Sequence, residues 1–143
     1  MDLLRMAALA GWLPLVTACA IVGSEPLPAA AGKPTLCLER HSKDDRNLAA
    51  VIEASFRHRG FSVITVAAGK CDPSLPLRVA YVDSFSWDMR VFLSRLTVEV
   101  FDGRSGESLA IGEAFQDSLA AMGDSYQDVV DRAMGALLGK DSS

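Results

Sequence analysis

The sequence has little of what metalloenzymes and nucleic-acid-binding proteins are built from. Among its 143 residues only two are His and three are Cys, and no Cys-x-x-Cys pair occurs. This scarcity of ligands argues against a metal site. The formal net charge is −4 at pH 7, so the chain has no basic footprint for nucleic acid.

The motifs of nucleophilic and phosphate-binding enzymes are also missing. Residues 103–106 (GRSG) are one residue short of G-x-S-x-G. Gly69 and Lys70 lack the upstream glycine and the following Ser or Thr of a phosphate loop. His41 and His58 fall at opposite ends of an expected helix, about 25 Å apart, and we expect both to be solvated. The sequence therefore predicts no enzyme activity and no cofactor.

The N-terminus has the organisation of an export signal. Residues 1–5 are weakly positive, residues 6–16 are uncharged and mostly apolar, and the small residues Thr17 and Ala18 follow. The apolar run would span about 16 Å as a helix, roughly half of a bilayer core, and Pro14 removes a helical hydrogen bond. We expect a signal peptide over residues 1–18 rather than a membrane-spanning anchor.

Residues 16–19 (VTAC) resemble the lipobox of bacterial lipoprotein precursors, with an aliphatic residue three positions before the cysteine and a small one directly before it. The resemblance implies cleavage between Ala18 and Cys19 and a diacylglyceryl thioether on Cys19. Two or more acyl chains make membrane attachment stable. Ala20, in place of Asp, favours the periplasmic face of the outer membrane, by similarity to the sorting rule of enteric lipoproteins. The alternative is a plain signal-peptidase site beside an unmodified cysteine.

The composition and length of the chain after the signal peptide predict one domain on a tether. Residues 19–34 are rich in Pro and Ala, which suggests an extended linker that could hold the domain some 40 Å from the membrane. Residues 35–139 have the length of one domain, and residues 140–143 are expected to be a disordered tail.

Cys37 and Cys71 make an even pair in an exported chain, which suggests a disulfide. It would close a loop of about 35 residues and stabilise the fold by roughly 3–4 kcal/mol in the chain-entropy model. For the two sulfurs to meet, the loop after the second strand must fold back toward the first. The alternative is two unpaired thiols.

The periodicity of apolar residues predicts the order β-α-β-β-β-β-α. This is an α+β, mixed α/β fold: a two-layer sandwich with a mixed five-stranded sheet and two helices on one face. Ser42 and Asp45 resemble a capping box for the first helix, and Ser125 and Asp128 resemble one for the second. Gly135, inside the second helix, suggests a close packing contact. The expected strands are 35–39, 61–67, 77–83, 92–102 and 108–115, and the helices carry apolar stripes at 48, 51, 52, 55 and 56 and at 126, 129, 130, 133, 134, 137 and 138.

Residues 81–90 (YVDSFSWDMR) are expected to connect two strands, and they hold the best candidate site. Here the sequence resembles a family of small, functionally uncharacterised lipoproteins of Gram-negative bacteria. The resemblance is carried by the lipobox, by a turn at residues 102–106, and by a Y-x-D-x(3)-W-D-M segment with Tyr81, Asp83, Trp87, Asp88 and Met89. It implies no activity.

Two interpretations of this segment stay open. Asp83, Trp87, Asp88 and Arg90 could form a binding corner for a sugar, a peptide or a cation, although two aspartates are few ligands for a cation. Alternatively, Trp87 fills the edge of the core and Asp88 accepts backbone N–H groups in a turn. We expect the second arrangement.

Three functions follow from these observations. The first is a non-enzymatic envelope lipoprotein, attached to the membrane through its N-terminal lipid, that binds another protein or an envelope component. The free edges of a small sheet would suit such a partner. The second is a small-ligand binding module that uses the corner at Asp83, Trp87, Asp88 and Arg90. The third, an unusual hydrolase, has the least support.

Overall fold

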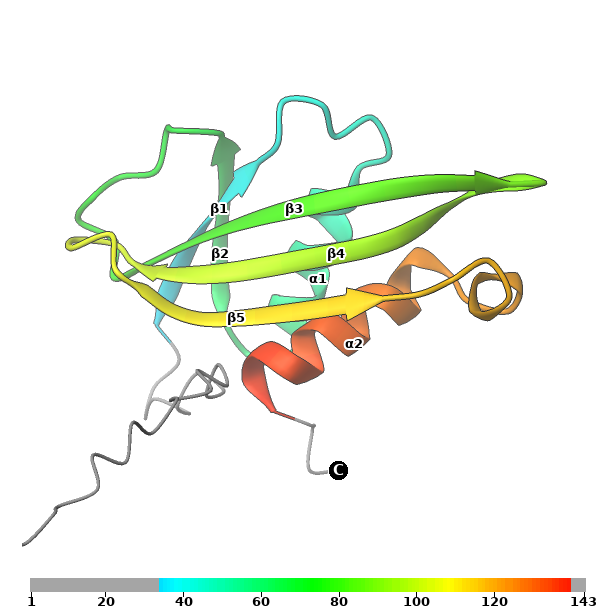
Figure 1. The fold of residues 1–143 in the computed structure, drawn as a ribbon. Helices are drawn as coiled ribbons and strands as arrows, with labels where there is room; N and C mark the ends of the chain where they lie inside the picture. The colour runs from blue at the N-terminus through cyan, green and yellow to red at the C-terminus, as the bar shows by residue number, and fades with distance from the viewer. Residues whose placement is uncertain (1–33, 140–143) are drawn as a thin grey trace, which may run out of the picture.

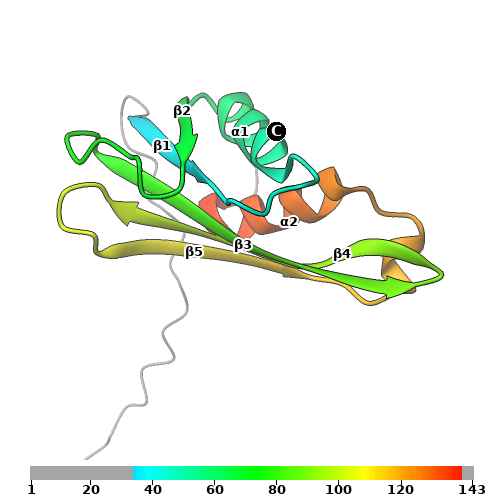
Figure 2. The ribbon, with the colours of Figure 1, turned by 90° about the horizontal axis from the view of Figure 1, so that it is seen from above.

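The structure, a computed structural model, describes residues 34–139; the lipobox, most of the expected tether and the C-terminal tail lie outside this range. The five strands form one mixed sheet in the order β2-β1-β3-β4-β5, and the two α-helices lie on the same face of it (Figures 1 and 2). The expected fold class is confirmed. In chain order the elements are β1 Thr35–Arg40, α1 Leu48–His58, β2 Ser62–Ala67, β3 Leu77–Asp88, β4 Arg90–Asp102, β5 Ser108–Phe115, the 3-10 helix η1 Ala120–Met122 and α2 Tyr126–Leu138.

The first three elements form the expected βαβ unit. β1 pairs in parallel with β2 on one side and with the start of β3 on the other. α1 ends in a left-handed Gly60, φ 89°, where the N–H groups of Gly60 and Phe61 bond back to the carbonyls of Arg57 and Phe56. This closing pattern satisfies carbonyl groups that the helix end leaves open.

The expected capping box of α1 is wrong. Neither Ser42 nor Asp45 caps the helix, which begins at Leu48 after a left-handed Asn47. The carboxylate of Asp44 instead accepts the N–H groups of Leu48 and Ala49, each at 2.7 Å. A carboxylate that bonds two free N–H groups can cap a helix from outside the Ncap position, so sequence spacing alone did not find it.

The core lies between the sheet and the helices. Leu96, Val98 and Val100 of β4 are fully buried, whereas Thr97 and Glu99 face the other side and are half-buried. This is the expected alternation of a sheet covered on one face. The capping box of Ser125 and Asp128 at α2 is also confirmed.

Close packing of α2 on the sheet depends on Gly112 of β5 and not on Gly135. A Cβ at Gly112 would lie 2.2 Å from the carbonyl oxygen of Ala133 and 2.7 Å from the Cβ of Leu137, whereas nothing lies within 4 Å of a Cβ at Gly135. The expectation for Gly135 was therefore wrong, because the helix presents that position away from the sheet.

The disulfide between Cys37 and Cys71 is present, with the Cα atoms 5.9 Å apart. Cys37 lies in β1 and is buried, and Cys71 lies in the loop between β2 and β3. That loop folds back over the first strand, as the pairing required.

β3 and β4 extend beyond the rest of the sheet as a two-stranded arm, residues 85–93, which leaves the body in Figure 1. β3 reaches Asp88 and β4 starts at Arg90, so residues 81–90 are not an inter-strand connection and the third strand does not end at residue 83. The chain reverses at Met89, whose φ is 58°. Polar residues occupy every second position here, at Ser84, Ser86 and Asp88. Because polar residues are also typical of loops, the sequence predicted a connection instead of a strand.

The arm leaves the sheet at a bulge on β4. Ser84 pairs with Arg95 and Phe85 pairs with Leu93, which leaves Ser94 without a partner residue on β3. The hydroxyl of Ser94 donates to the carbonyl of Ser84 at 2.9 Å, and the backbone N–H of Gln116 donates to the carbonyl of Ser94 at 2.9 Å. Bulges of this kind bend and twist a strand, here at the base of the arm.

Candidate functional site

Large apolar side chains are exposed on the arm and on the neighbouring segment around η1. Trp87 is 74% exposed, Met89 92%, Leu119 77% and Met122 74%, and Val91 is also exposed. We call these five residues the arm-end cluster. Soluble monomers expose single apolar side chains widely, but a gathering of large ones marks a contact site for a protein, a membrane or a ligand.

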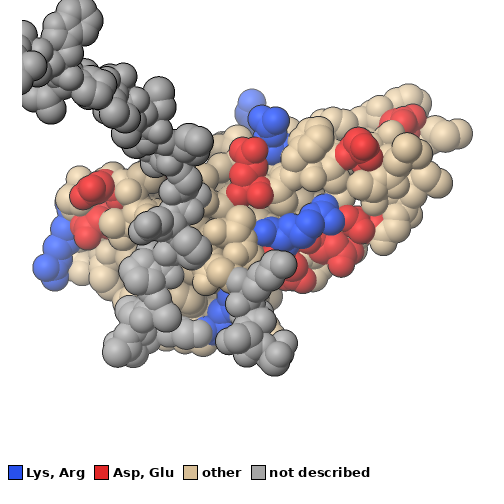
Figure 3. Space-filling view, turned by 60° about the horizontal axis from the view of Figure 1, so that its bottom comes forward, with Lys and Arg blue, Asp and Glu red and all other residues tan. Residues whose placement is uncertain are grey.

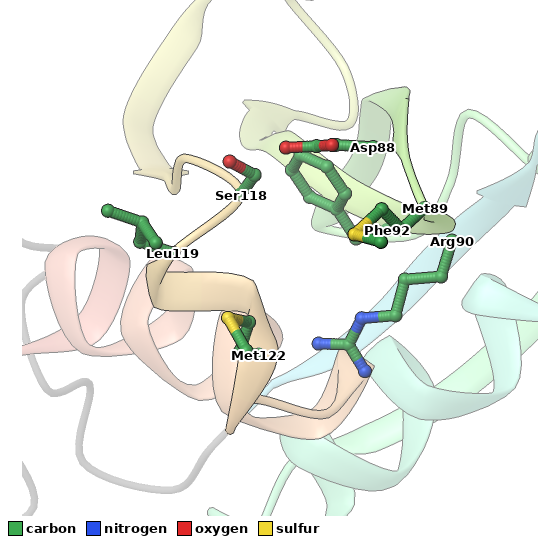
Figure 4. Close-up of a pocket in the computed structure, with 7 residues that line it drawn as sticks. All are labelled: Asp88, Met89, Arg90, Phe92, Ser118, Leu119 and Met122. Carbon is green, nitrogen blue, oxygen red and sulfur yellow. The ribbon is translucent and has the colours of Figure 1, made fainter.

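A pocket of about 430 Å³ lies between the arm and the segment around η1. In Figure 4, Met89 and Phe92 from the arm lie on one side, Leu119 and Met122 on the other, and the Arg90 side chain extends across the opening. We call this the arm pocket. Its lining is mostly apolar with one cation, one anion and one hydroxyl: Asp88, Met89, Arg90, Phe92, Ser118, Leu119 and Met122.

The two faces of the arm differ. Trp87 and Val91 are directly opposite each other across the hairpin, as are Asp88 and Arg90. Since side chains of directly paired residues share a face and neighbours along a strand alternate, Trp87 and Val91 project from one face and Asp88 and Arg90 from the other. Trp87 is accordingly absent from the lining of the arm pocket.

Trp87 is not packed at the edge of the core, so the expected arrangement is wrong. The arm extends past both helices, and no described element covers the indole. Within residues 34–139 the Asp88 side chain accepts no backbone N–H, and it lines the arm pocket instead. The tryptophan is a surface group.

The structure does not bring the four residues of the expected corner together. Asp83 lies in a separate hollow with residues 43–46 and Phe85, five positions before Asp88 along β3, or about 16 Å in an extended strand. Asp88 and Arg90 do meet at the arm pocket. Within residues 34–139 no group of three or more metal-ligating side chains occurs.

The most perturbed titratable group belongs to the body of the fold. The hydroxyl of Tyr81 donates to the Asp44 carboxylate at 2.9 Å and accepts the backbone N–H of His41 at 3.1 Å. Burial, opposed by the His41 N–H and reinforced by the charge of Asp44, raises the pKa of Tyr81 far above its ordinary value. This pair holds the loop before α1 against β3.

Charges are mixed on the face of the molecule that Figure 3 shows. Figure 3 shows basic and acidic side chains next to one another rather than in separate patches, and uncharged residues form most of the surface toward the end of the arm. Among residues 34–139 no helix is long and apolar enough to cross a bilayer. The four most exposed large apolar side chains of residues 34–139 belong to the arm-end cluster.

Sequence reasoning missed Phe92, Leu119 and Met122 as site residues. Phe92 falls in an expected strand, and residues 116–124 lie between the last expected strand and the last expected helix, with no element predicted there. The available signal was the apolar stretch LAAM within an otherwise polar link, which forms η1 and exposes two large side chains.

No family model and no curated protein matches the chain. Several solved structures resemble it, among them the following two. The PelC dodecamer of Paraburkholderia phytofirmans has a TM-score of 0.53 at 11% identity, over 82% of this chain and 95% of that chain. The lipoprotein GNA1162 of Neisseria meningitidis has a TM-score of 0.43 at 11% identity, over 62% and 90% of the two chains. At this identity the PelC match shows a common fold and nothing further.

Proposed function

We propose that this chain is a lipid-anchored protein of the bacterial cell envelope, attached at Cys19, that acts by binding protein and assembles with copies of itself. The observation that carries the binding role is the arm-end cluster, where four large apolar side chains are each at least 74% exposed. Exposure on this scale is costly in water and is relieved when a partner covers it.

The anchor is supported by the lipobox-like residues 16–19 at the end of an apolar run. The disulfide supports an exported domain, since such bonds persist in oxidising compartments. With Ala20 after the lipidated cysteine, we place the domain at the periplasmic face of the outer membrane.

Self-assembly is supported by the fold. The PelC chain that shares it forms a dodecamer, and a domain with one exposed apolar projection is suited to a repeating contact. In this proposal the chain works as a structural or scaffolding unit, not as an enzyme.

The small-ligand alternative has weaker support. Asp83 lies in one hollow, Asp88 and Arg90 line the arm pocket, and Trp87 lines neither. The four residues therefore do not converge on one small molecule. The arm pocket retains only Asp88 and Arg90 of that set.

Two measurements test this proposal. Mass spectrometry of the native N-terminal peptide should show an acylated Cys19; an unmodified cysteine, or a different first residue, would remove the anchor. Chemical crosslinking of the full chain in intact envelopes should give species of two or more copies. If the full chain remains a single copy in its own membrane, self-assembly is excluded.

A further inference from the structure

We propose that Met89 and Met122 are oxidation sites, and that their conversion to methionine sulfoxide by a peroxide weakens the contact made by the arm-end cluster. The effect on binding rests on the function proposed above, whereas the oxidation itself does not. The proposed modification holds whichever molecule covers the arm-end cluster.

The exposed methionines of the described domain gather at one place. Five methionines occur in the sequence, and Met1 and Met6 fall in the expected signal peptide. Of the other three, Met89 is 92% exposed and Met122 is 74% exposed, whereas Met134 is fully buried in the core. Met89 and Met122 come from different elements, yet both line the arm pocket, on opposite sides of it (Figure 4). The fold thus presents two thioethers at one site and protects the third.

Met89 occupies a backbone conformation that seldom carries methionine. It reverses the chain with a φ of 58°, in the left-handed region where Gly, Asn and Asp are favoured and a larger side chain is strained. Hairpin turns that need a positive φ are usually built from these same three residue types. Turn formation therefore does not explain a methionine at the end of the arm.

Thioethers are the exposed sulfur groups that an oxidant meets on this domain. Thiolates are the usual first target of oxidants in proteins. Cys37 and Cys71 are joined in a disulfide, so residues 34–139 hold no free thiol. Methionine is the other common site of oxidation, and exposure then selects Met89 and Met122 over Met134.

The reaction transfers one oxygen atom from the peroxide to the sulfur. A lone pair of the methionine Sδ attacks one oxygen of hydrogen peroxide, the O–O bond breaks and an S–O bond forms. The proton on the transferred oxygen passes to the departing hydroxide, which leaves as water. Sulfur is oxidised by two electrons and the peroxide is reduced by two, so no cofactor and no further reactant is needed.

Oxidation makes the arm-end cluster polar where a partner must cover it. A sulfoxide replaces a flexible apolar side chain by a polar one, a change that disrupts interfaces rich in methionine. Both sides of the arm pocket change, because Met89 and Met122 lie on opposite sides of it. An apolar partner that buries a sulfoxide removes the hydrogen bonds that this group makes with water, which is unfavourable.

Arg90 favours the oxidised state of the uncovered pocket. Its side chain extends across the opening of the arm pocket (Figure 4), and its guanidinium makes no ion pair or hydrogen bond within residues 34–139. A guanidinium donates hydrogen bonds and accepts none, so it can donate to a sulfoxide oxygen but gains nothing comparable from a thioether.

Peroxide mapping tests the chemistry. The full chain, extracted from its membrane, is treated with hydrogen peroxide, and tandem mass spectrometry of its peptides locates each added oxygen. We expect Met89 and Met122 to oxidise at least about tenfold faster than Met134, because the core shields that sulfur. In concentrated urea, which unfolds the chain, the three rates should become similar. Equal rates in the folded chain, or no reaction at Met89 and Met122, would overturn the inference.

Molar mass by light scattering, before and after peroxide, tests the effect on binding. The native chain should change from several copies to a single copy. Met89→Leu with Met122→Leu is compared with itself, and peroxide should not change its mass, since leucine is apolar and has no sulfur. Met89→Gln with Met122→Gln carries polar groups without oxidation and should be a single copy in both conditions.

The other outcomes contradict the inference in distinguishable ways. A native chain that is oxidised at both residues and stays assembled, or a glutamine variant that stays assembled, would remove the control by oxidation and leave the proposed function intact. A leucine variant that dissociates in peroxide would place the effect at another residue. A leucine variant that is a single copy before treatment would show that apolar surface alone does not hold the copies together.

Failure of the proposed function has its own signature. A native chain of single-copy mass before any treatment would remove self-assembly, and with it the effect on binding. The mapping would still decide whether Met89 and Met122 are the oxidation sites.

Discussion

The hydroxyl of Tyr81 lies 2.9 Å from the carboxylate of Asp44, and the two residues are 37 positions apart in the chain. The same carboxylate caps α1 through Leu48 and Ala49. One side chain thus joins the helix start to the strand that continues into the arm.

Asp44→Ala should destabilise the domain. The change removes two helix-capping hydrogen bonds and leaves the buried Tyr81 hydroxyl without its acceptor, which together cost roughly 2–3 kcal/mol. Urea unfolding measures the loss, and Asp45→Ala is the matched control because Asp45 is exposed and its side chain makes no recorded bond within residues 34–139. Equal loss in the two variants would contradict the capping role.

The same carboxylate should make stability depend on acidic pH. Burial alone would raise the pKa of Asp44, but the N–H groups of Ala49 and Leu48, the Tyr81 hydroxyl and the charge of Arg40 outweigh it and hold the pKa below 3.8. A carboxyl whose pKa is lower in the folded state stabilises the fold above its unfolded pKa and loses that contribution as the pH falls through the folded value.

The stability difference between the native chain and Asp44→Asn should therefore be constant above about pH 5 and shrink below about pH 4. Unfolding by urea across this range measures it. Other acidic groups cancel in the difference, since both chains share them. A difference that stays unchanged down to pH 2 would show that Asp44 has no lowered pKa.

Gly112→Ala and Gly135→Ala should have opposite effects. The added methyl at Gly112 would meet the Ala133 carbonyl oxygen at 2.2 Å, so α2 must move off the sheet at a cost of about 2 kcal/mol or more. At Gly135 the methyl meets open space and helix propensity gains up to about 1 kcal/mol. Thermal unfolding distinguishes the two variants. Equal changes in stability would contradict the packing of α2 against Gly112.

Replacing both Cys37 and Cys71 by Ala should lower the free energy of unfolding by roughly 3 kcal/mol in the chain-entropy model, given a separation of 34 residues. Unfolding of the native chain with and without reductant provides the comparison. Reductant should then have no effect on the double variant. If it destabilises both chains equally, the effect does not come from this bond.

The strands and helices of the body of the fold could be predicted because short local sequence patterns determine them. The alternation at Leu96, Val98 and Val100 and the box at Ser125 and Asp128 are local signals whose physical meaning does not depend on distant residues. The disulfide was predictable as a pairing, although its loop geometry was not.

The site could be predicted only in part. The composition of the segment with Trp87, Asp88 and Arg90 makes it unusual, but its environment depends on where the helices end relative to β3 and β4. The relative position of the helix ends and the two strands is determined by long-range packing. The capping role of Asp44 also depends on long-range packing. Leu119 and Met122 join the site through the bulge at Ser94 and its bond to Gln116, which no local pattern reveals.

The most direct test of the account is the molar mass of the full chain extracted from its membrane, by light scattering, beside Trp87→Ser and Val82→Ser. We expect several copies for the native chain and for Val82→Ser, and a single copy for Trp87→Ser, whose free energy of unfolding should change by less than about 0.5 kcal/mol because the indole is exposed. A native chain of single-copy mass, or a Trp87→Ser chain that stays assembled, would contradict it.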